Sequence, residues 1–332
     1  MRLEDCNLDL DLAVSAPLTR TEPEPTWVEA RESGALPDSV FELYHLAEYL
    51  SFGSAPPFLA DDDNILFSYF GIILEGVLDS LAEAQEHQQR FGEAVNQTYD
   101  LGKKVRGEPW DPNAPLRARR AFRYLLLSEV AALDAVADLT AILLTGLIPR
   151  LRVGRARFSS IEGWLSRPLA PAALILTPQE HFLTELYDRL GPLVHPATGE
   201  REWLPLMRLY RNKGAHLGSS VFRQIGLHDN SGRFYTFFPR QWPYIWERHM
   251  KPAGQTYRGS TLPELFRQTL IHQDVVSYTA GLSNKVRTVV GAAALVLGSA
   301  YKQLGQLSFN QAALAELQDN SEMYAFEQFV GT

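Results

Sequence analysis

The segment Arg211-Asn212-Lys213-Gly214-Ala215-His216 brings a permanent cation, an amide and a titratable imidazole close together along the chain. The planar guanidinium of Arg211 is suited to holding and neutralising a phosphate group. The imidazole of His216 can transfer a proton near neutral pH. With the amide of Asn212 to orient them, these groups are suited to cleaving an RNA phosphodiester without a metal ion.

The spacing of these groups matters because we expect residues 203–217 to form a short helix. Asn212 and His216 lie four residues apart, so they share one face of that helix. Arg211 lies to one side of this face, and Gly214 weakens the helix enough to let Arg211 and His216 converge. We therefore predict that Arg211, Asn212 and His216 form a catalytic set.

Three residues near the motif are candidates for binding the substrate. Arg208 extends the polar face by one turn, Lys213 adds a cation, and Tyr210 is placed either to stack a base or simply to pack. An alternative stays open for the whole segment. Arginine, asparagine and histidine on a surface helix are more often solvated side chains and caps than catalytic groups.

Three acidic residues on an otherwise apolar helical stretch form a second group of candidates. Asp134 and Asp138 are four residues apart, and burying either carboxylate is costly unless it is paired. They are placed to face Arg211 across a bundle or to hold a core arginine, and Glu129 is a similar candidate. We expect all three to support the catalytic set rather than to belong to it.

The bulk composition excludes several kinds of site. The chain has 332 residues, of which 45% are hydrophobic, and this is enough for a full core. Its single cysteine, Cys6, excludes an internal disulfide framework and any multi-cysteine zinc site. The eight histidines form no His-x-x-x-His or His-Glu-x-x-His pair, so we expect no metal and no other cofactor.

Charge and hydropathy favour a cytoplasmic protein that does not enter a membrane. The first residues lack the pattern of a secretory signal, and the apolar stretches at 131–148 and 289–300 are interrupted by acids or too short to span a bilayer. The net charge is −8, yet arginines gather in runs. Two runs precede the motif: Arg117, Arg119, Arg120 and Arg123, and then Arg150, Arg152, Arg155 and Arg157. Such runs are as often solvated helix ends as nucleic-acid contacts.

Apolar periodicity predicts a mostly helical chain. Two long helices are expected at residues 64–105 and 116–147, joined as an antiparallel hairpin by a proline-containing loop. A helix beginning at Pro178 is expected to end before Pro192, because proline interrupts a helix interior. The last helical region is expected at 262–307.

The remaining segments are expected to be less regular. Residues 1–62 are predicted to be an irregular extension that packs on the core, with a short helix over 41–50. Residues 150–178 are predicted to be a loop with one helical turn near 160–166. A hairpin signal, His228 to Gly232 between two apolar runs, predicts a β-hairpin near 220–240.

These elements favour an all-α fold, a helical bundle of four to five main helices with a small β-hairpin and an irregular N-terminal segment. The predicted domains are the N-terminal extension at 1–62 and a helical bundle domain at 63–332. The hairpin would be an insertion in the second of these.

The motif Arg211-Asn212-x-x-x-His216, on a helix of a mostly helical chain, resembles the HEPN superfamily. That superfamily is a helical bundle found in RNA-cleaving toxins, CRISPR-associated ribonucleases and antiviral defence proteins. Its signature is an arginine, commonly followed by asparagine or another polar residue, and then a histidine a few residues later. The resemblance covers the motif closely, and it covers residues 64–307 by architecture alone.

The resemblance implies a metal-independent endoribonuclease. His216 would act as general base on the ribose 2′-hydroxyl or as general acid toward the leaving oxygen, Arg211 would stabilise the scissile phosphate, and Asn212 would orient either group. Family members commonly build the cleft from two protomers, which implies a homodimer that acts on RNA. The expected setting is a bacterial toxin–antitoxin or antiviral defence system with a partner protein. The alternative is a non-catalytic HEPN-like scaffold that binds RNA or protein.

Overall fold

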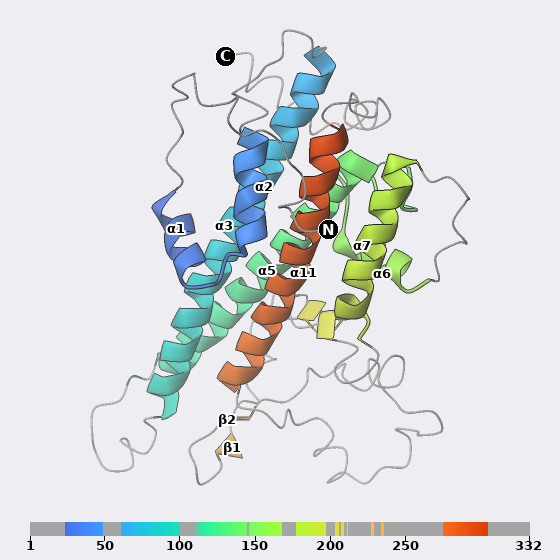
Figure 1. Cartoon of the computed structure of the whole chain (residues 1–332). Helices are drawn as coiled ribbons and strands as arrows, with labels where there is room; N and C mark the ends of the chain where they lie inside the picture. The colour runs from blue at the N-terminus through green and yellow to red at the C-terminus, as the bar shows by residue number, and fades with distance from the viewer. Residues whose placement is uncertain are drawn as a thin grey trace, which may run out of the picture. The chain divides into compact units, whose positions relative to one another are not determined.

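The computed structural model describes residues 24–48, 61–99, 111, 113–144, 146–167, 177–196, 203–205, 207–208, 211, 227–228, 234–235 and 275–304. Nearly all of these residues are helical, as the ribbons of Figure 1 show. The all-α class that the sequence predicts is therefore confirmed.

The chain divides into two compact units. Unit 1 comprises residues 1–78, 134–189 and 290–332, and unit 2 comprises residues 79–133 and 190–289. Four helices contribute residues to both units: α3 (Asp61–Tyr99), α5 (Ala114–Leu144), α7 (Pro178–Val194) and α11 (Val275–Leu304). The domain boundary expected near residue 62 stays a prediction.

Two helices occupy part of the segment that we expected to be irregular. Helix α1 spans Pro25–Glu32, so the irregular conformation expected there is wrong, while helix α2 (Asp38–Glu48) confirms the short helix predicted over 41–50 as far as residue 48. Pro25 is the first residue of α1, where the missing N–H and fixed φ of proline favour a helix start. In α2 the buried residues recur at helical spacing: Val40, Phe41, Leu43, Tyr44 and Ala47.

Within unit 1, α2 packs closely against α11 at a glycine. The hydroxyl of Ser39 donates a hydrogen bond to the carbonyl oxygen of Gly291, with an Oγ–O distance of 2.9 Å. A Cβ atom on Gly291 would lie only 3.1 Å from the Cβ of Pro37. The small residue therefore sets how near the two helices approach in this unit.

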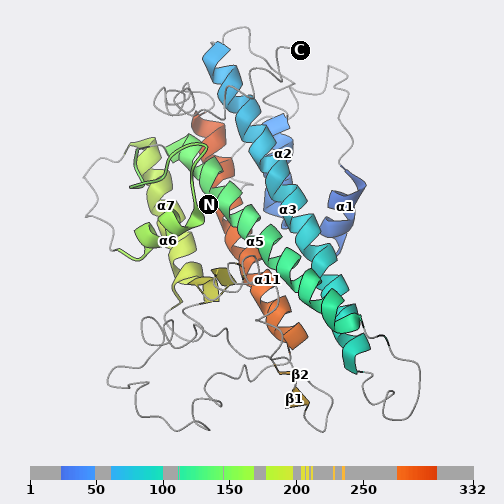
Figure 2. The same ribbon diagram turned by 180° about the vertical axis from the view of Figure 1, so that it is seen from behind.

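Within unit 2, α3 and α5 run antiparallel and side by side, as Figures 1 and 2 both show. Contacts pair residues whose numbers fall along α3 as they rise along α5: Gln97 with Arg117, Phe91 with Phe122, His87 with Tyr124, and Glu83 with Ser128. The helical hairpin predicted from the sequence is confirmed over this stretch. Its observed helices begin and end a few residues from the predicted bounds.

Helix α7 begins as predicted and ends later than predicted. Thr177 and Glu180 form a capping box, in which the Glu180 amide donates to the Thr177 hydroxyl and the Thr177 amide donates to the Glu180 carboxylate. The helix then continues through Pro192 to Val194, so the expected end before Pro192 is wrong. Because Pro192 lies in the last turn, its missing N–H removes one bond near the helix end rather than breaking the interior.

Two further elements differ from their predicted extents. The single turn expected near 160–166 is an eight-residue helix, α6 (Phe158–Leu165). Helix α11 continues through Gly281, and the part of the predicted region before Val275 lies outside the described residues.

Two short strands are described, β1 (Leu227–His228) and β2 (Phe234–Tyr235). They pair antiparallel, with Leu227 opposite Tyr235 and His228 opposite Phe234. Two residues on each side do not establish the hairpin expected near 220–240, which stays a prediction.

Candidate functional site

The start of the motif segment is anchored by buried apolar side chains. Trp203, Leu204 and Met207 are almost fully buried, and the backbone is helical at 203–205, 207–208 and 211. The indole Nε1 of Trp203 donates a hydrogen bond to the carbonyl oxygen of Leu193, at 3.2 Å. This bond ties the segment to the last turn of α7 and agrees with the predicted helix as far as the description reaches.

The cationic end of the motif lies partly inside the protein. Arg208 and Arg211 are both half-buried. The Nε atom of Arg211 is buried, and it has no hydrogen-bond partner. An N–H group that loses water without gaining an acceptor costs free energy, and an anion that accepted from it would recover that cost.

The other motif residues lie outside the described part of the chain. These are Tyr210, Asn212, Lys213 and His216. The catalytic set and the substrate-binding roles of Tyr210 and Lys213 therefore stay predictions.

Unit 2 holds several buried polar atoms that lack a partner. Among its described residues these atoms are Nδ1 of His87, Nε of Arg119, Nε of Arg123, Oε2 of Glu129 and Nε of Arg211. Most buried polar atoms in folded proteins are hydrogen-bonded, so these atoms are exceptions among the described residues of the unit. Three of these five atoms belong to arginines.

Glu129, expected to support the catalytic set, is enclosed between helices of unit 2. Its side chain is 1% exposed, and one carboxylate oxygen accepts a hydrogen bond from the hydroxyl of Ser283 on α11. Burial raises the pKa of Glu129 to about 7, opposed by the Ser283 hydrogen bond and by the charge of Arg287. Burial likewise lowers the pKa of Arg287, and the charge of Glu129 opposes that change.

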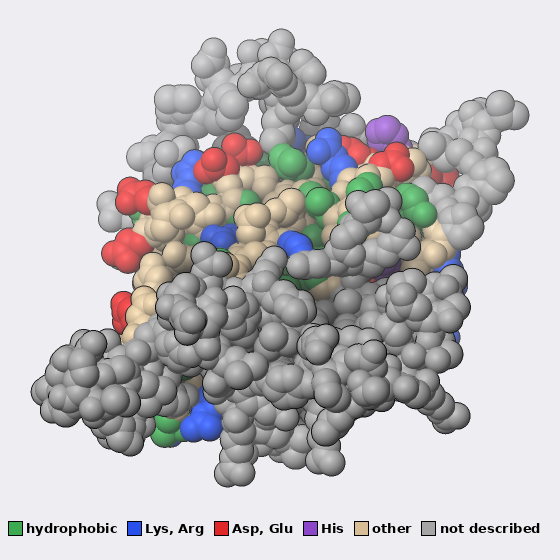
Figure 3. Space-filling model, turned by 90° about the horizontal axis from the view of Figure 1, so that it is seen from below, with side chains coloured by type: hydrophobic (Ala, Val, Ile, Leu, Met, Phe, Trp, Pro, Cys, Tyr) green, Lys and Arg blue, Asp and Glu red, His purple; other side chains and the backbone are tan. Residues whose placement is uncertain are grey.

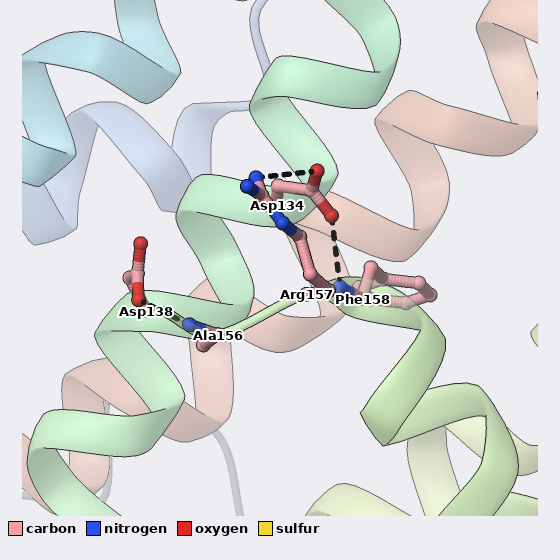
Figure 4. Close-up of polar contacts among 5 residues, drawn as sticks. All are labelled: Asp134, Asp138, Ala156, Arg157 and Phe158. Atoms are coloured by element: carbon pink, nitrogen blue, oxygen red, sulfur yellow. Dashed lines mark hydrogen bonds and ion pairs between the residues drawn. The ribbon is translucent and has the colours of Figure 1, made fainter. Parts of the chain in front are cut away.

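Asp134 and Asp138 hold the segment that leads into α6, as Figure 4 shows. Oδ1 of Asp138 accepts from the backbone N–H of Ala156 at 3.0 Å, and Oδ1 of Asp134 accepts from that of Phe158 at 2.9 Å. Oδ2 of Asp134 also pairs with the guanidinium of Arg157 at 3.3 Å. Burial raises the pKa of Asp138 to about 6, while the hydrogen bond from Ala156 opposes this shift.

Asp134 and Asp138 can bond alternate backbone amides of the segment before α6, because one helical turn and two extended residues have nearly the same length. Four residues of α5 advance by about 6 Å, while two residues of extended chain advance by about 6.6 Å. Arg157 is extended, so the amides of residues 156 and 158 match Asp134 and Asp138 one turn apart. The described partners of Asp134 and Asp138 are backbone amides and Arg157, whose side chain is 70% exposed, rather than Arg211 or a core arginine, the two alternatives that we had left open.

The second arginine run, over residues 150–157, lies in the segment that leads into α6. Buried residues alternate with exposed arginines over most of 150–157: Leu151, Val153 and Ala156 are buried, while Arg150, Arg152, Arg155 and Arg157 are exposed. A segment that buries alternate residues places the intervening ones in solvent. Solvation of a surface therefore accounts for these four arginines.

The described surface carries charges of both signs. On the face drawn in Figure 3, acidic and basic side chains are interspersed, without a large area of one sign. The described residues include no group of three side chains suited to holding a metal ion. They also include no helix long and apolar enough to cross a membrane.

Two contacts of unit 2 were missed by sequence reasoning. The rings of His87 and Tyr124 stack with centroids 5.3 Å apart, and Ser283 hydrogen-bonds Glu129. Burial and the charge of Arg90 lower the pKa of His87. Each contact joins residues from different helices, so neither produces a local pattern. The one signal that the sequence offered for these contacts was a polar residue recurring on an otherwise apolar helix face.

The described part of unit 2 therefore contains half-buried arginines whose Nε–H groups lack acceptors, and one buried carboxyl whose pKa is near neutrality. Comparison with models of known families, with curated proteins and with solved structures found no match to this chain.

Proposed function

We propose that the protein is a metal-independent endoribonuclease of the HEPN type. The observation that carries the proposal is the buried Nε of Arg211, which has no hydrogen-bond partner. Arg211 begins the Arg211-Asn212-x-x-x-His216 motif, so the cation that the chemistry needs has an Nε–H without an acceptor. A phosphate oxygen would accept from this N–H and receive a full positive charge beside it.

The reaction follows from the groups of the motif. His216 takes the proton of a ribose 2′-hydroxyl, and the 2′-oxygen then bonds to the adjacent phosphorus atom. The bond from phosphorus to the 5′-oxygen breaks, and that oxygen takes up a proton to leave as a hydroxyl. Arg211 stabilises the charge that develops on the phosphate, and Asn212 orients the imidazole or the phosphate. The products are a 2′,3′-cyclic phosphate and a 5′-hydroxyl end, so DNA is not a substrate.

The finer features of the proposal concern assembly and setting. The chain would form a bundle of four to five main helices that dimerises through the motif segment, giving a composite cleft. It would act in the cytoplasm in a bacterial toxin–antitoxin or antiviral defence system, under the control of a partner protein. Support comes from the motif itself and from the helical fold around Arg208 and Arg211.

The deciding experiment is incubation of total RNA with the purified protein in excess EDTA. We expect cleavage to continue, because the motif supplies phosphate binding and proton transfer without a metal. Arg211→Ala and His216→Ala should each abolish cleavage with little change in thermal unfolding, since both side chains are polar. Matched controls are Arg189→Ala and His181→Ala, which remove the same side-chain types from α7.

Each outcome separates the candidate functions. Cleavage that needs magnesium and stops in EDTA would overturn the mechanism. RNA binding without cleavage by the wild-type protein would favour the non-catalytic scaffold. If Arg211→Ala unfolds the protein, Arg211 is structural and its assignment is wrong.

A further inference from the structure

Two arginines on α5, Arg119 and Arg123, lack the carboxylate partners that five other described arginines have. Five described arginines each pair with a carboxylate: Arg31 with Asp38, Arg90 with Glu86, Arg117 with Asp111, Arg157 with Asp134, and Arg189 with Glu185. Arg119 and Arg123 form no ion pair with a described residue, and the Nε atom of each is buried without a hydrogen-bond partner. Their charges therefore lack the acceptors that the other five have.

Arg119 and Arg123 are arranged to act on one ligand. They lie four residues apart on α5, so they share a face and are separated by about 6 Å along the helix axis. Both side chains are half-buried, which leaves part of each accessible from solvent. Two guanidinium groups one turn apart, each with an unused N–H, are suited to gripping the oxygens of a phosphodiester chain.

The residues that follow each arginine extend this arrangement. Arg120 is exposed, and the side chain of Tyr124 is 48% exposed. One face of the Tyr124 ring rests on the imidazole of His87, with an interplanar angle of 27°. An aromatic ring held in place from behind and open in front is suited to stacking a nucleic-acid base.

The acidic residues closest to His87 are already engaged. Glu86 pairs with Arg90, and Glu83 accepts a hydrogen bond from Ser128 at 3.1 Å. Neither pairs with an α5 arginine among the described contacts. The α5 arginines next to Tyr124 are therefore available to an external anion.

We propose that Arg119, Arg120, Arg123 and Tyr124, here called the α5 patch, bind single-stranded RNA. Arg119 and Arg123 hold successive phosphates, Arg120 adds attraction, and Tyr124 stacks a base. The inference rests on the proposed endoribonuclease function, because it assigns the patch to that substrate. Single-stranded RNA fits best, since bases in a duplex are already stacked and unavailable to Tyr124.

The phosphate contacts are tested by the salt dependence of binding. In a His216→Ala background and in EDTA, the affinities for a short single-stranded RNA and for the DNA of the same sequence are measured over a range of salt concentrations. Each phosphate contact to a single strand contributes about 0.7 to the slope of log K against log salt. Arg119→Gln with Arg123→Gln should reduce the magnitude of that slope by about 1.4 for both probes. Arg189→Gln, which removes an ion-paired arginine from α7, should leave it unchanged.

Two further variants test the donors and the ring. Arg119→Lys with Arg123→Lys should keep the salt slope and still weaken binding several-fold, because lysine keeps the charge and lacks the guanidinium fork. Tyr124→Leu should weaken RNA binding on the order of 10-fold, while Tyr124→Phe should bind as the parent does. The lysine pair also serves as the test if the glutamine pair does not fold.

The DNA probe separates this inference from the proposed function. DNA offers the same phosphates but has no 2′-hydroxyl, so it reports binding without cleavage. A changed slope on DNA, together with RNA that the wild-type protein leaves uncleaved, would support the α5 patch and overturn the nuclease. Cleaved RNA with unchanged slopes in the glutamine and lysine pairs would overturn the α5 patch and leave the nuclease standing.

Discussion

At the scale of single residues, Glu129 is an acidic side chain that the fold removes almost completely from water. It is held by Ser283 and lies near the charge of Arg287, yet its second oxygen has no hydrogen-bond partner. Desolvation outweighs both favourable contacts, so its pKa lies near 7 rather than at the ordinary 4.5. The neutral acid is therefore the form that the fold stabilises.

This shift predicts a stability that falls as pH rises. The folded protein holds the Glu129 proton more tightly than the unfolded chain does, since the pKa is about 7 in the first and near 4.5 in the second. The contribution is fully present below about pH 4.5, and it is lost as pH rises through about 7. The loss amounts to about 3 kcal/mol, taking 1.36 kcal/mol for each pKa unit.

Glu129→Gln should remove this dependence, because glutamine stays neutral and still accepts from the Ser283 hydroxyl. The free energy of unfolding, measured by denaturant titration at several pH values, should fall for the wild type relative to this variant over that window. Glu86→Gln, which removes an exposed carboxylate from α3, serves as the control. A constant difference between wild type and Glu129→Gln from about pH 4 to about pH 8 would show that folding does not raise the pKa of Glu129.

At the scale of elements, the two aspartates of α5 replace a cap that α6 lacks. Arg157, at the N-cap position of α6, makes no side-chain capping bond, and the first helical amide, that of Phe158, is satisfied by Asp134 instead. The left-handed backbone at Arg150, with φ of 67°, lies in the same connection. A side chain from a neighbouring helix thus fixes where the connection ends and α6 begins.

Removal of this cap should cost stability without removing activity. Asp134→Ala should lower the free energy of unfolding by about 1 kcal/mol, the usual cost of losing an N-terminal cap. Asp138→Asn should cost less, because its amide oxygen still accepts from the Ala156 N–H. Thermal unfolding and RNA cleavage measured on the same samples test both statements. If Asp134→Ala loses cleavage while its unfolding is unchanged, Asp134 supports the catalytic set instead.

At the scale of the whole molecule, one Arg-His set in each chain supplies few groups for binding a nucleic acid. The net charge of −8 and the interspersed charges of Figure 3 give little general attraction for RNA. A second copy of the chain would double the local cations near the motif. Assembly is therefore the feature on which the proposed composite cleft depends.

We predict that activity depends on protein concentration more steeply than in direct proportion. If the cleft needs two protomers, dilution below the dimer dissociation constant should reduce the cleavage rate per mole of chain. Light scattering over the same range should show the dimer give way to the monomer. If the protein is a monomer with the same specific activity at every dilution, the site is not composed of two protomers.

How much was visible in the sequence differs from residue to residue. The hairpin of α3 and α5, the Pro178 helix start and the burial of the apolar helix faces follow from local periodicity and capping chemistry, and each is confirmed within the described residues. Helix α1 was missed because proline was taken as a break, although Pro25 is the first residue of that helix. The late end of α7 was hidden because the effect of a proline depends on its place within the helix.

The sequence by itself determined the helical class and the motif that suggests RNA chemistry, because helical periodicity and residue types are local properties of the chain. Only the tertiary structure decided which polar groups lose their water. Glu129, Arg119 and Arg123 resemble other charged residues of their helix until the fold removes the Glu129 carboxyl and the two arginine Nε atoms from water. Desolvation depends on atoms that are distant in sequence, and it is desolvation that separates a buried acid or an unpaired guanidinium from a solvated one.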